Sequence, residues 1–253
     1  GLGDVYKRQV PQLVAAIHAQ CKTEEFWADQ ISFDEYCLDW EQAVHAFELT
    51  HGRAPVLYDV FCGEGGFSRG ARAAGLQCYG FDNRAKFNKR YEYDHGRTPT
   101  DRVPSGMTFA RRDLGDEAFW DELERRGRVG DFPAPDIIHA SPPCRQYTRL
   151  SSVAKQLEQD DVGVDWVISR LQRVEATRGR TQPLTWQVEN VPESENHITG
   201  DVTSRLRLCG AMMGLRVFRH RVFYCNYEAA HGLKHSHEAV SYTHLTLPTR
   251  SYV

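Results

Sequence analysis

From Val56 to Asp82 the chain reads VLYDVFCGEGGFSRGARAAGLQCYGFD, the pattern of a strand, a glycine turn, a helix and a second strand. The first apolar run, Val56–Phe61, has the length of a strand, and the glycines after it allow a sharp turn and a close approach to a ligand. The helix ends at Gly75, and the next apolar run ends in the carboxylate of Asp82. Strands that alternate with helices predict an α/β fold with a mostly parallel sheet.

The position of Asp82 indicates what the glycine turn could bind. Asp82 lies 19 residues after Gly63, the spacing at which a strand–helix–strand unit brings an acid to the hydroxyl pair of a ribose. The helix after the turn also offers unpaired amides to a ligand. These features fit any adenosine-containing cofactor, and a glycine turn alone would equally serve NAD, FAD or another nucleotide.

A cysteine follows a second apolar strand, in the sequence DIIHASPPCRQYT of residues 136–148. Asp136–His139 is expected to be the strand, and Pro142 and Pro143 end it because proline lacks the amide donor and fixes its own φ. Cys144 is therefore predicted on a stiff turn at the carboxyl end of a strand, where open α/β sheets bind ligands. A lone Pro-Pro-Cys sequence is also compatible with a buried, incidental cysteine.

Two later segments carry charged side chains within apolar strands. In Leu184–Val191 the apolar pattern is broken by Glu189, whose expected burial would raise its pKa and suit it to hold or donate a proton. A structural carboxylate paired with a cation would show the same pattern. In Val217–Tyr224 the period of two places Arg219 and Arg221 on one side of a strand, where two guanidinium groups suit a base carbonyl and a phosphate or carboxylate.

Together these segments resemble, in order, four signature blocks of the cytosine-C5 DNA methyltransferases, and the resemblance covers residues 56–226. It implies a Rossmann-like methyltransferase fold that binds S-adenosylmethionine. It implies a catalytic set of Cys144, Glu189, Arg219 and Arg221. The cofactor would contact Phe61, Gly63, Glu64, Gly65, Gly66, Asp82, Asn83, Asp113, Leu114 and Pro142. For Asp113 the alternative is that it begins the next helix, since Asp is a favoured cap.

The chemistry implied by the resemblance is methyl transfer to a cytosine flipped out of duplex DNA. Cys144 would add to C6 so that C5 can attack a methyl sulfonium, while Glu189 holds N3 and the exocyclic amine and Arg221 holds O2. RNA cytosine methylation and a non-catalytic nucleic-acid-binding relative are the alternatives. A nicotinamide oxidoreductase would share the glycine turn but would not need the other blocks.

The sequence departs from the family pattern in several places. Arg145 stands where the family has Gln after the cysteine, and Val217 stands where the arginine block usually opens with Gln. The family's target-recognition region and final helix are not visible after the arginine block. We therefore expect a catalytic fragment, monomeric and acting on DNA in the cytoplasm of a bacterial or phage-infected cell.

Composition gives the outer limits. With 253 residues, 41% hydrophobic, the chain can bury a full core, and its seven cysteines contain no C-x-x-C pair, which favours a reducing compartment. No apolar run has the length of a membrane span and no signal peptide opens the chain, so a soluble protein is expected.

The net charge is −3, but the charges are unevenly distributed along the sequence. Residues 166–226 carry nine Arg against five Asp/Glu, or +4, so a polyanion is expected to meet that region. An Arg-rich solvated face is the alternative.

The chain divides into five expected segments. Residues 10–54 form an acidic helical extension, 55–228 the catalytic domain and 229–240 a tail that begins the missing recognition region. Residues 1–9 and 241–253 resemble translated sequencing-adapter read-through and are interpreted as foreign to the protein. Within the tail, His231, His235 and His237 lack partners at zinc spacing, so no metal is expected.

Overall fold

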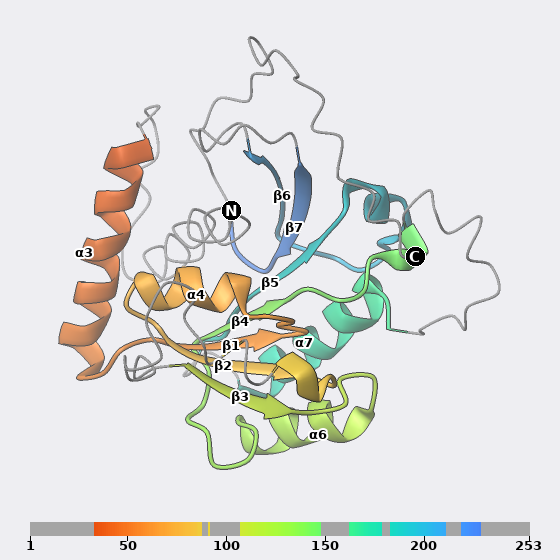
Figure 1. Ribbon diagram of the computed structural model, residues 1–253, viewed down its shortest axis with the longest axis horizontal. Coiled ribbons are helices and arrows are strands. Elements are labelled where there is room, and N and C mark those ends of the chain that lie inside the picture. Colours follow the sequence, from red (N-terminus) through yellow and green to blue (C-terminus); the bar gives the residue numbers. More distant parts are fainter. Residues whose placement is uncertain are drawn as a thin grey trace, which may run out of the picture.

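The computed structural model describes residues 33–87, 91, 107–147, 162–178, 183–210 and 219–228, which form a sheet flanked by helices (Figure 1). The helices are α3 (Phe33–His51), α4 (Gly66–Ala73), α6 (Glu117–Arg126) and α7 (Val164–Arg178), with 3-10 turns η1 (Ala85–Phe87), η2 (Arg145–Tyr147) and η4 (Pro192–His197). The strands are β1 (Val56–Val60), β2 (Gln77–Asp82), β3 (Met107–Arg111), β4 (Ile137–Ala140), β5 (Thr185–Asn190), β6 (Ser204–Cys209) and β7 (His220–Cys225).

Within the described residues the sheet has the strand order β3-β2-β1-β4-β5-β7-β6. Strands β3, β2, β1, β4 and β5 are all parallel to one another, and β7 is antiparallel to both β5 and β6. The chain builds outward from β1 to β3 and then returns to place β4 on the other side of β1. This confirms the predicted Rossmann-like class, and it puts the reversal of strand order, where such sheets bind ligands, between β1 and β4.

Two apolar layers cover the sheet, because successive side chains of a strand point to opposite faces. Val56, Tyr58 and Val60 of β1 pack with α6 and α7, whereas Leu57 packs with α3 and α4. Figure 1 shows α3 and α4 together on one side of the sheet. All five residues of β1 are buried, as expected for a central parallel strand covered on both faces.

The helices follow local signals in the sequence. Helix α6 begins where the Asp116 carboxylate accepts a hydrogen bond from Ala118 N (3.0 Å) and ends at Gly127, whose φ of 66° suits the residue after a helix. Helix α7 buries an apolar stripe of Val164, Val167, Ile168, Leu171 and Val174, which recur at three- and four-residue spacing. No helix in the described ranges is both long and apolar enough to cross a membrane.

Some expectations fall on the rest of the chain. The segments 1–9, 229–240 and 241–253, including the three histidines of the tail, lie outside the described residues, as does the first part of the 10–54 extension. Its last part is α3, which packs Ala43, Val44 and Phe47 against α4. Between β2 and β3 the structure describes only residues 83–87, which include η1, and Tyr91.

Candidate active site

The predicted site residues come together at one edge of the sheet because β1, β2, β4 and β5 all end there. Val60 pairs with Phe81 of β2 and with Ala140 of β4, and Ala140 pairs with Val188 of β5. The glycine turn after β1, the Pro-Pro-Cys turn after β4 and Glu189 near the end of β5 therefore lie along neighbouring strands. The sheet brings into one row segments that are far apart in the sequence.

Glu189 is buried and held by two partners. Its side chain is only 7% exposed, Arg221 Nε lies 2.8 Å from Oε1, and the Ser141 hydroxyl donates to Oε2 at 3.1 Å. Burial raises the pKa of Glu189, while the charge of Arg221 and the hydrogen bond from Ser141 oppose the rise. The result is a carboxylate with fixed orientation that can exchange a proton more readily than an exposed glutamate. Its catalytic role stays a prediction, because a structural ion pair has the same geometry.

The two predicted arginines occupy different positions. Arg221 lies in β7 with 17% of its side chain exposed and pairs with Glu189. Arg219 is exposed and precedes β7, which begins at His220, so the expectation that both arginines belong to one strand is wrong. The charge of Arg219 still lowers the pKa of Glu189, so both guanidinium groups act on this carboxylate.

Cys144 is partly exposed on a turn that is fixed from both sides. Before it, Ser141 N donates to Val60 O (3.0 Å), and Asn190 Nδ2 donates to the carbonyl of Pro142 (3.1 Å). After it, Tyr147 N donates to the carbonyl of Cys144 (3.0 Å), which starts η2. The turn that carries the cysteine is thus tied to β5 immediately beside Glu189.

The glycine turn and Asp82 form a compact acidic site. Gly63 N donates to Asp82 Oδ2 (3.1 Å), and Arg84 N donates to Oδ1 (3.0 Å), so this nearly buried carboxylate is held between the turns after β1 and β2. Phe61 has a φ of 60°, unusual for a bulky residue, and Gly63 has a φ of 53° with open space where a Cβ would stand. An oriented acid beside an open turn fits the ribose of an adenosine-containing cofactor.

Gly65 serves internal packing. With a φ of 75°, its missing Cβ would overlap the ring of Tyr91, and a Cβ on Gly80 would overlap the same ring. Tyr91 is 1% exposed, and its hydroxyl donates to Ser68 Oγ at 2.6 Å. The sequence suggests a close approach to a ligand for this glycine, whereas the structure shows an aromatic ring packed beneath the turn.

The other predicted cofactor contacts lie around the same edge. Gly66 begins α4, and the carbonyl of Glu64 accepts from Arg69 (2.7 Å). Asn83 and Pro142 follow β2 and β4, exposed and buried respectively. These residues remain predicted contacts.

Asp113, the acid after β3, was expected either to contact the cofactor or to begin the next helix. The Asp113 carboxylate is exposed and accepts from Gly115 N (3.1 Å), whereas Asp116 caps α6, so the alternative that Asp113 begins the helix is wrong. Leu114 is 2% exposed within the core layer formed with α6 and α7.

Four polar residues near this edge escaped the sequence analysis. His139 and Gln187 are buried side by side in β4 and β5, and Ser141 connects them to Glu189. Asp59 is 1% exposed in β1 and accepts from the Ser68 hydroxyl at 2.5 Å. A polar residue within an apolar strand is the sequence signal that marks Asp59, His139 and Gln187.

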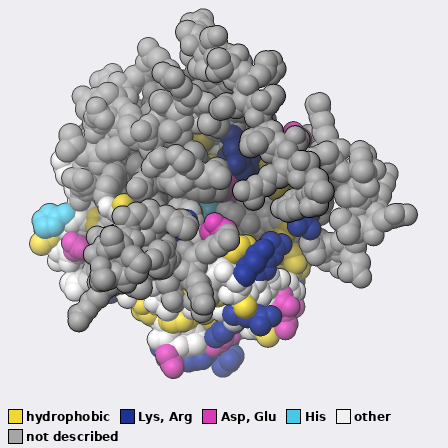
Figure 2. All heavy atoms as spheres, viewed as in Figure 1, with side chains coloured by type: hydrophobic (Ala, Val, Ile, Leu, Met, Phe, Trp, Pro, Cys, Tyr) yellow, Lys and Arg dark blue, Asp and Glu magenta, His cyan; other side chains and the backbone are white. Residues whose placement is uncertain are grey.

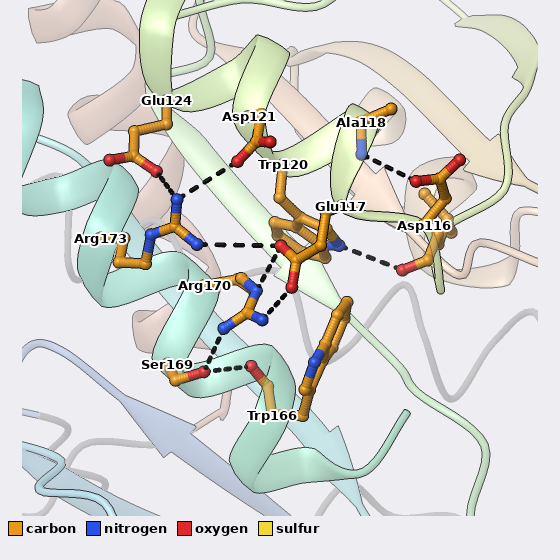
Figure 3. Close-up of polar contacts among 11 residues, drawn as sticks. Asp116, Glu117, Ala118, Trp120, Asp121, Glu124, Trp166, Ser169, Arg170 and Arg173 are labelled. Carbon is orange, nitrogen blue, oxygen red and sulfur yellow. Dashed lines mark hydrogen bonds and ion pairs between the residues drawn. The ribbon is translucent and has the colours of Figure 1, made fainter. Parts of the chain in front are cut away.

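Part of the positive charge predicted to meet a polyanion is neutralised within the fold. Arg173 of α7 lies 2.5 Å from Glu124 and 3.2 Å from Asp121 of α6, and Arg170 pairs with Glu117 (Figure 3). Figure 2 likewise shows basic and acidic side chains mixed on the described surface. The net charge of +4 in residues 166–226 therefore overstates the positive charge that this region presents.

Comparison with known proteins adds little to this geometry. No family model and no curated protein matches the chain. Among solved structures, a SAM-dependent methyltransferase from Agrobacterium tumefaciens is 18% identical over 78% of this chain and 62% of its own, with a TM-score of 0.45. The tRNA (uracil-54, C5)-methyltransferase of Pyrococcus abyssi is 11% identical over 73% of this chain and 38% of its own, with a TM-score of 0.36. The chain thus spans less than two thirds of either protein, and these scores are too low for an activity to be inferred from them.

Proposed function

We propose that this chain is an S-adenosylmethionine-dependent methyltransferase that modifies C5 of cytosine in DNA. The observation that carries the proposal is the position of Glu189, buried between Arg221 and Ser141 and tied through Asn190 to the turn of Cys144. A nucleophile, a proton-holding acid and a guanidinium at one sheet edge are what addition to a pyrimidine ring needs. The sequence resemblance supplies the substrate class, and the edge beside the glycine turn supplies the place for a cofactor.

Cys144, Glu189 and Arg221 have separate roles in the proposed reaction. The Cys144 thiolate forms a bond to C6 of the flipped base, and Glu189 holds a proton at N3 so that the charge developing on the ring is neutralised. Arg221 holds the carbonyl oxygen O2 of the base and keeps Glu189 oriented. The glycine turn and Asp82 would hold S-adenosylmethionine, which would supply an electrophilic methyl group for C5. A base from solvent then takes the C5 proton, Cys144 leaves C6 as the thiolate, and the N3 proton returns to Glu189, so the aromatic ring is restored.

Covalent trapping tests the proposal. The full chain is incubated with labelled S-adenosylmethionine and a random-sequence DNA duplex in which 5-fluorocytosine replaces cytosine. Fluorine at C5 cannot leave as a proton does, so the adduct with the enzyme persists. We expect a labelled protein–DNA adduct with the unmodified chain but none with Cys144→Ala. The control is Cys225→Ala, which changes a buried cysteine at the end of β7 opposite Arg221 and should still give the adduct.

Two outcomes contradict the proposal. Equal trapping by the unmodified chain and by Cys144→Ala removes the cysteine from the reaction. An adduct with RNA that contains 5-fluorocytosine, without one on DNA, transfers the same chemistry to RNA and refutes the DNA substrate.

A further inference from the structure

A chain of buried and partly buried polar side chains runs across β4 and β5 to Glu189. Tyr227 Oη donates to Gln187 Oε1 (2.8 Å), and Gln187 Nε2 lies 3.0 Å from His139 Nδ1. His139 Nε2 lies 2.9 Å from Ser141 Oγ, which donates to Glu189 Oε2 at 3.1 Å. His139 is fully buried and Gln187 is 2% exposed, so the middle of this chain is closed to solvent.

The position of each proton follows from counting donors and acceptors. An ionised Glu189 can only accept, so the Ser141 hydroxyl proton points toward it and Ser141 Oγ must accept from His139. This places the ring proton of His139 on Nε2. Burial lowers the pKa of His139 to about 3, so the ring is neutral and its bare Nδ1 accepts from the Gln187 amide. Every hydrogen bond in the chain is then satisfied in one direction, ending at the carboxylate.

The His139 ring is also fixed by packing. It stacks on Phe67 of α4 with a centroid distance of 3.6 Å and an interplanar angle of 11°. Phe67 belongs to the helix that follows the glycine turn and is 3% exposed. Stacking sets the plane of the imidazole, and Gln187 sets its tautomer. The two constraints leave Nε2–H directed at Ser141.

We propose that His139 is a positioning residue for Glu189, acting through the hydroxyl of Ser141 to fix the carboxylate orientation that the substrate meets. This inference rests on the proposed function, since it assigns a role to residues behind the acid of that site. His139 itself does not touch the substrate. Its contribution is to hold the Ser141 oxygen in place through Nε2–H, so that one oxygen of Glu189 is held by Ser141 while Arg221 holds the other.

The pKa of Glu189 depends on the hydrogen bond from Ser141 and on the charges around its carboxylate. The charged and titratable groups that face its carboxylate are His139 from β4, Arg219 and Arg221 at β7, and Asp59 from β1, with Ser141 as the neutral donor. The Ser141 hydrogen bond favours the ionised form and so lowers the pKa of Glu189 against the effect of burial. Loss of that hydrogen bond should therefore raise the pKa of Glu189.

The kinetic test compares Ser141→Ala, His139→Phe and the double variant in methyl transfer to random-sequence duplex DNA. His139→Phe keeps an aromatic ring on Phe67 but removes both ring nitrogens. We expect each single variant to lower kcat about 10-fold, the effect of one lost hydrogen bond to a charged group, with KM for S-adenosylmethionine unchanged. The double variant should be no slower than either single one, because both remove the same interaction. The apparent pKa assigned to Glu189 in the pH–rate profile should rise equally in both single variants.

Controls separate positioning from loss of structure. Ser169→Ala removes a half-buried hydroxyl that donates to Trp166 O in α7, away from this edge, and should leave kcat unchanged. Thermal unfolding midpoints show whether each variant folds. If His139→Phe does not fold, Ser141→Ala decides through kcat and its pH profile. An unchanged kcat in Ser141→Ala, or additive losses in the double variant, overturns the inference.

A readout without turnover separates this inference from the proposed function. Nitrogen-15 NMR of the histidine rings shows which nitrogen carries the proton, and the His139 signals are identified by their loss in His139→Phe. We expect the Nε2–H tautomer in the unmodified chain and a shift of Nε2 in Ser141→Ala. A protein without methyltransferase activity but with this tautomer would refute the proposed function and leave the hydrogen-bond chain standing. The Nδ1–H tautomer would overturn the hydrogen-bond chain, whatever the activity.

Discussion

Asp59 offers a test of the fold that needs no substrate. It is a carboxyl group buried in β1 beneath the glycine turn, where its Oδ2 accepts from both the hydroxyl (2.5 Å) and the amide (3.3 Å) of Ser68. Burial raises its pKa to about 7, the hydrogen bonds from Ser68 oppose the rise, and the nearby Glu189 and Asp82 carboxylates add to it. Asp59→Asn keeps an acceptor for Ser68 but cannot ionise.

The effect on stability follows from proton linkage. The folded chain holds the Asp59 proton more tightly than the unfolded chain, so this group stabilises the fold most below its unfolded pKa of 3.8, and the stabilisation is lost as pH rises through about 7. The difference between these pKa values corresponds to about 4 kcal/mol. Of this, more than half, about 3 kcal/mol, is lost between pH 5 and pH 8. The unmodified chain should lose that stability and Asp59→Asn should not.

Urea unfolding at a series of pH values measures the difference. The free energy of unfolding of Asp59→Asn minus that of the unmodified chain should rise by about 3 kcal/mol from pH 5 to pH 8. Asp131→Asn, at an exposed turn, controls for the loss of one negative charge. A difference that stays flat or falls over this range would refute the argument, since it would mean that Asp59 is ionised in the folded chain at low pH.

Three further predictions concern the site and its support. Glu189→Gln should slow single-turnover methyl transfer by about 100-fold or more without preventing folding, because the proton-holding group is lost; retained activity would contradict its role. Asp116→Ala should lower the free energy of unfolding by about 1 kcal/mol in urea, because Ala118 N loses its cap, and an unchanged value would show that the cap is not needed. Gly65→Ala should destabilise by about 2 kcal/mol or more, and by more than Gly63→Ala, because both have positive φ but only Gly65 faces the Tyr91 ring; equal losses would contradict the packing argument.

The sequence was sufficient where a local pattern determines the structure. The glycine turn between β1 and α4 and the strand that ends before Pro142 and Pro143 are each encoded within about 15 residues, and both appear as expected. No strand was predicted at Ser204–Cys209, although exposed Arg205 and Arg207 alternate there with buried Leu206 and Leu208. That alternation is the sequence signal of a strand with one face exposed.

The parts of the site that the sequence did not reveal depend on pairing between distant strands. His139 lies beside Gln187 only because β4 and β5 are neighbours in register, with those two residues directly opposed. Tyr91 reaches Gly65 and Gly80 from a segment with no regular pattern. The position of Arg219 was predicted incorrectly for another reason. Arg219 and Arg221 are two residues apart, as the pattern of a strand requires, but β7 begins one residue after Arg219.

The antiparallel pair β6–β7 affects the order in which the strands can fold while the chain is synthesised on the ribosome. A nascent chain that has emerged only as far as β5 exposes the outer backbone of that strand and carries Glu189 without the cation of Arg221. Docking of β7 caps the open strand and compensates the buried acid in a single step. The carboxyl group of Glu189 therefore gains its cation only after the parallel strands from β1 to β5 have been synthesised.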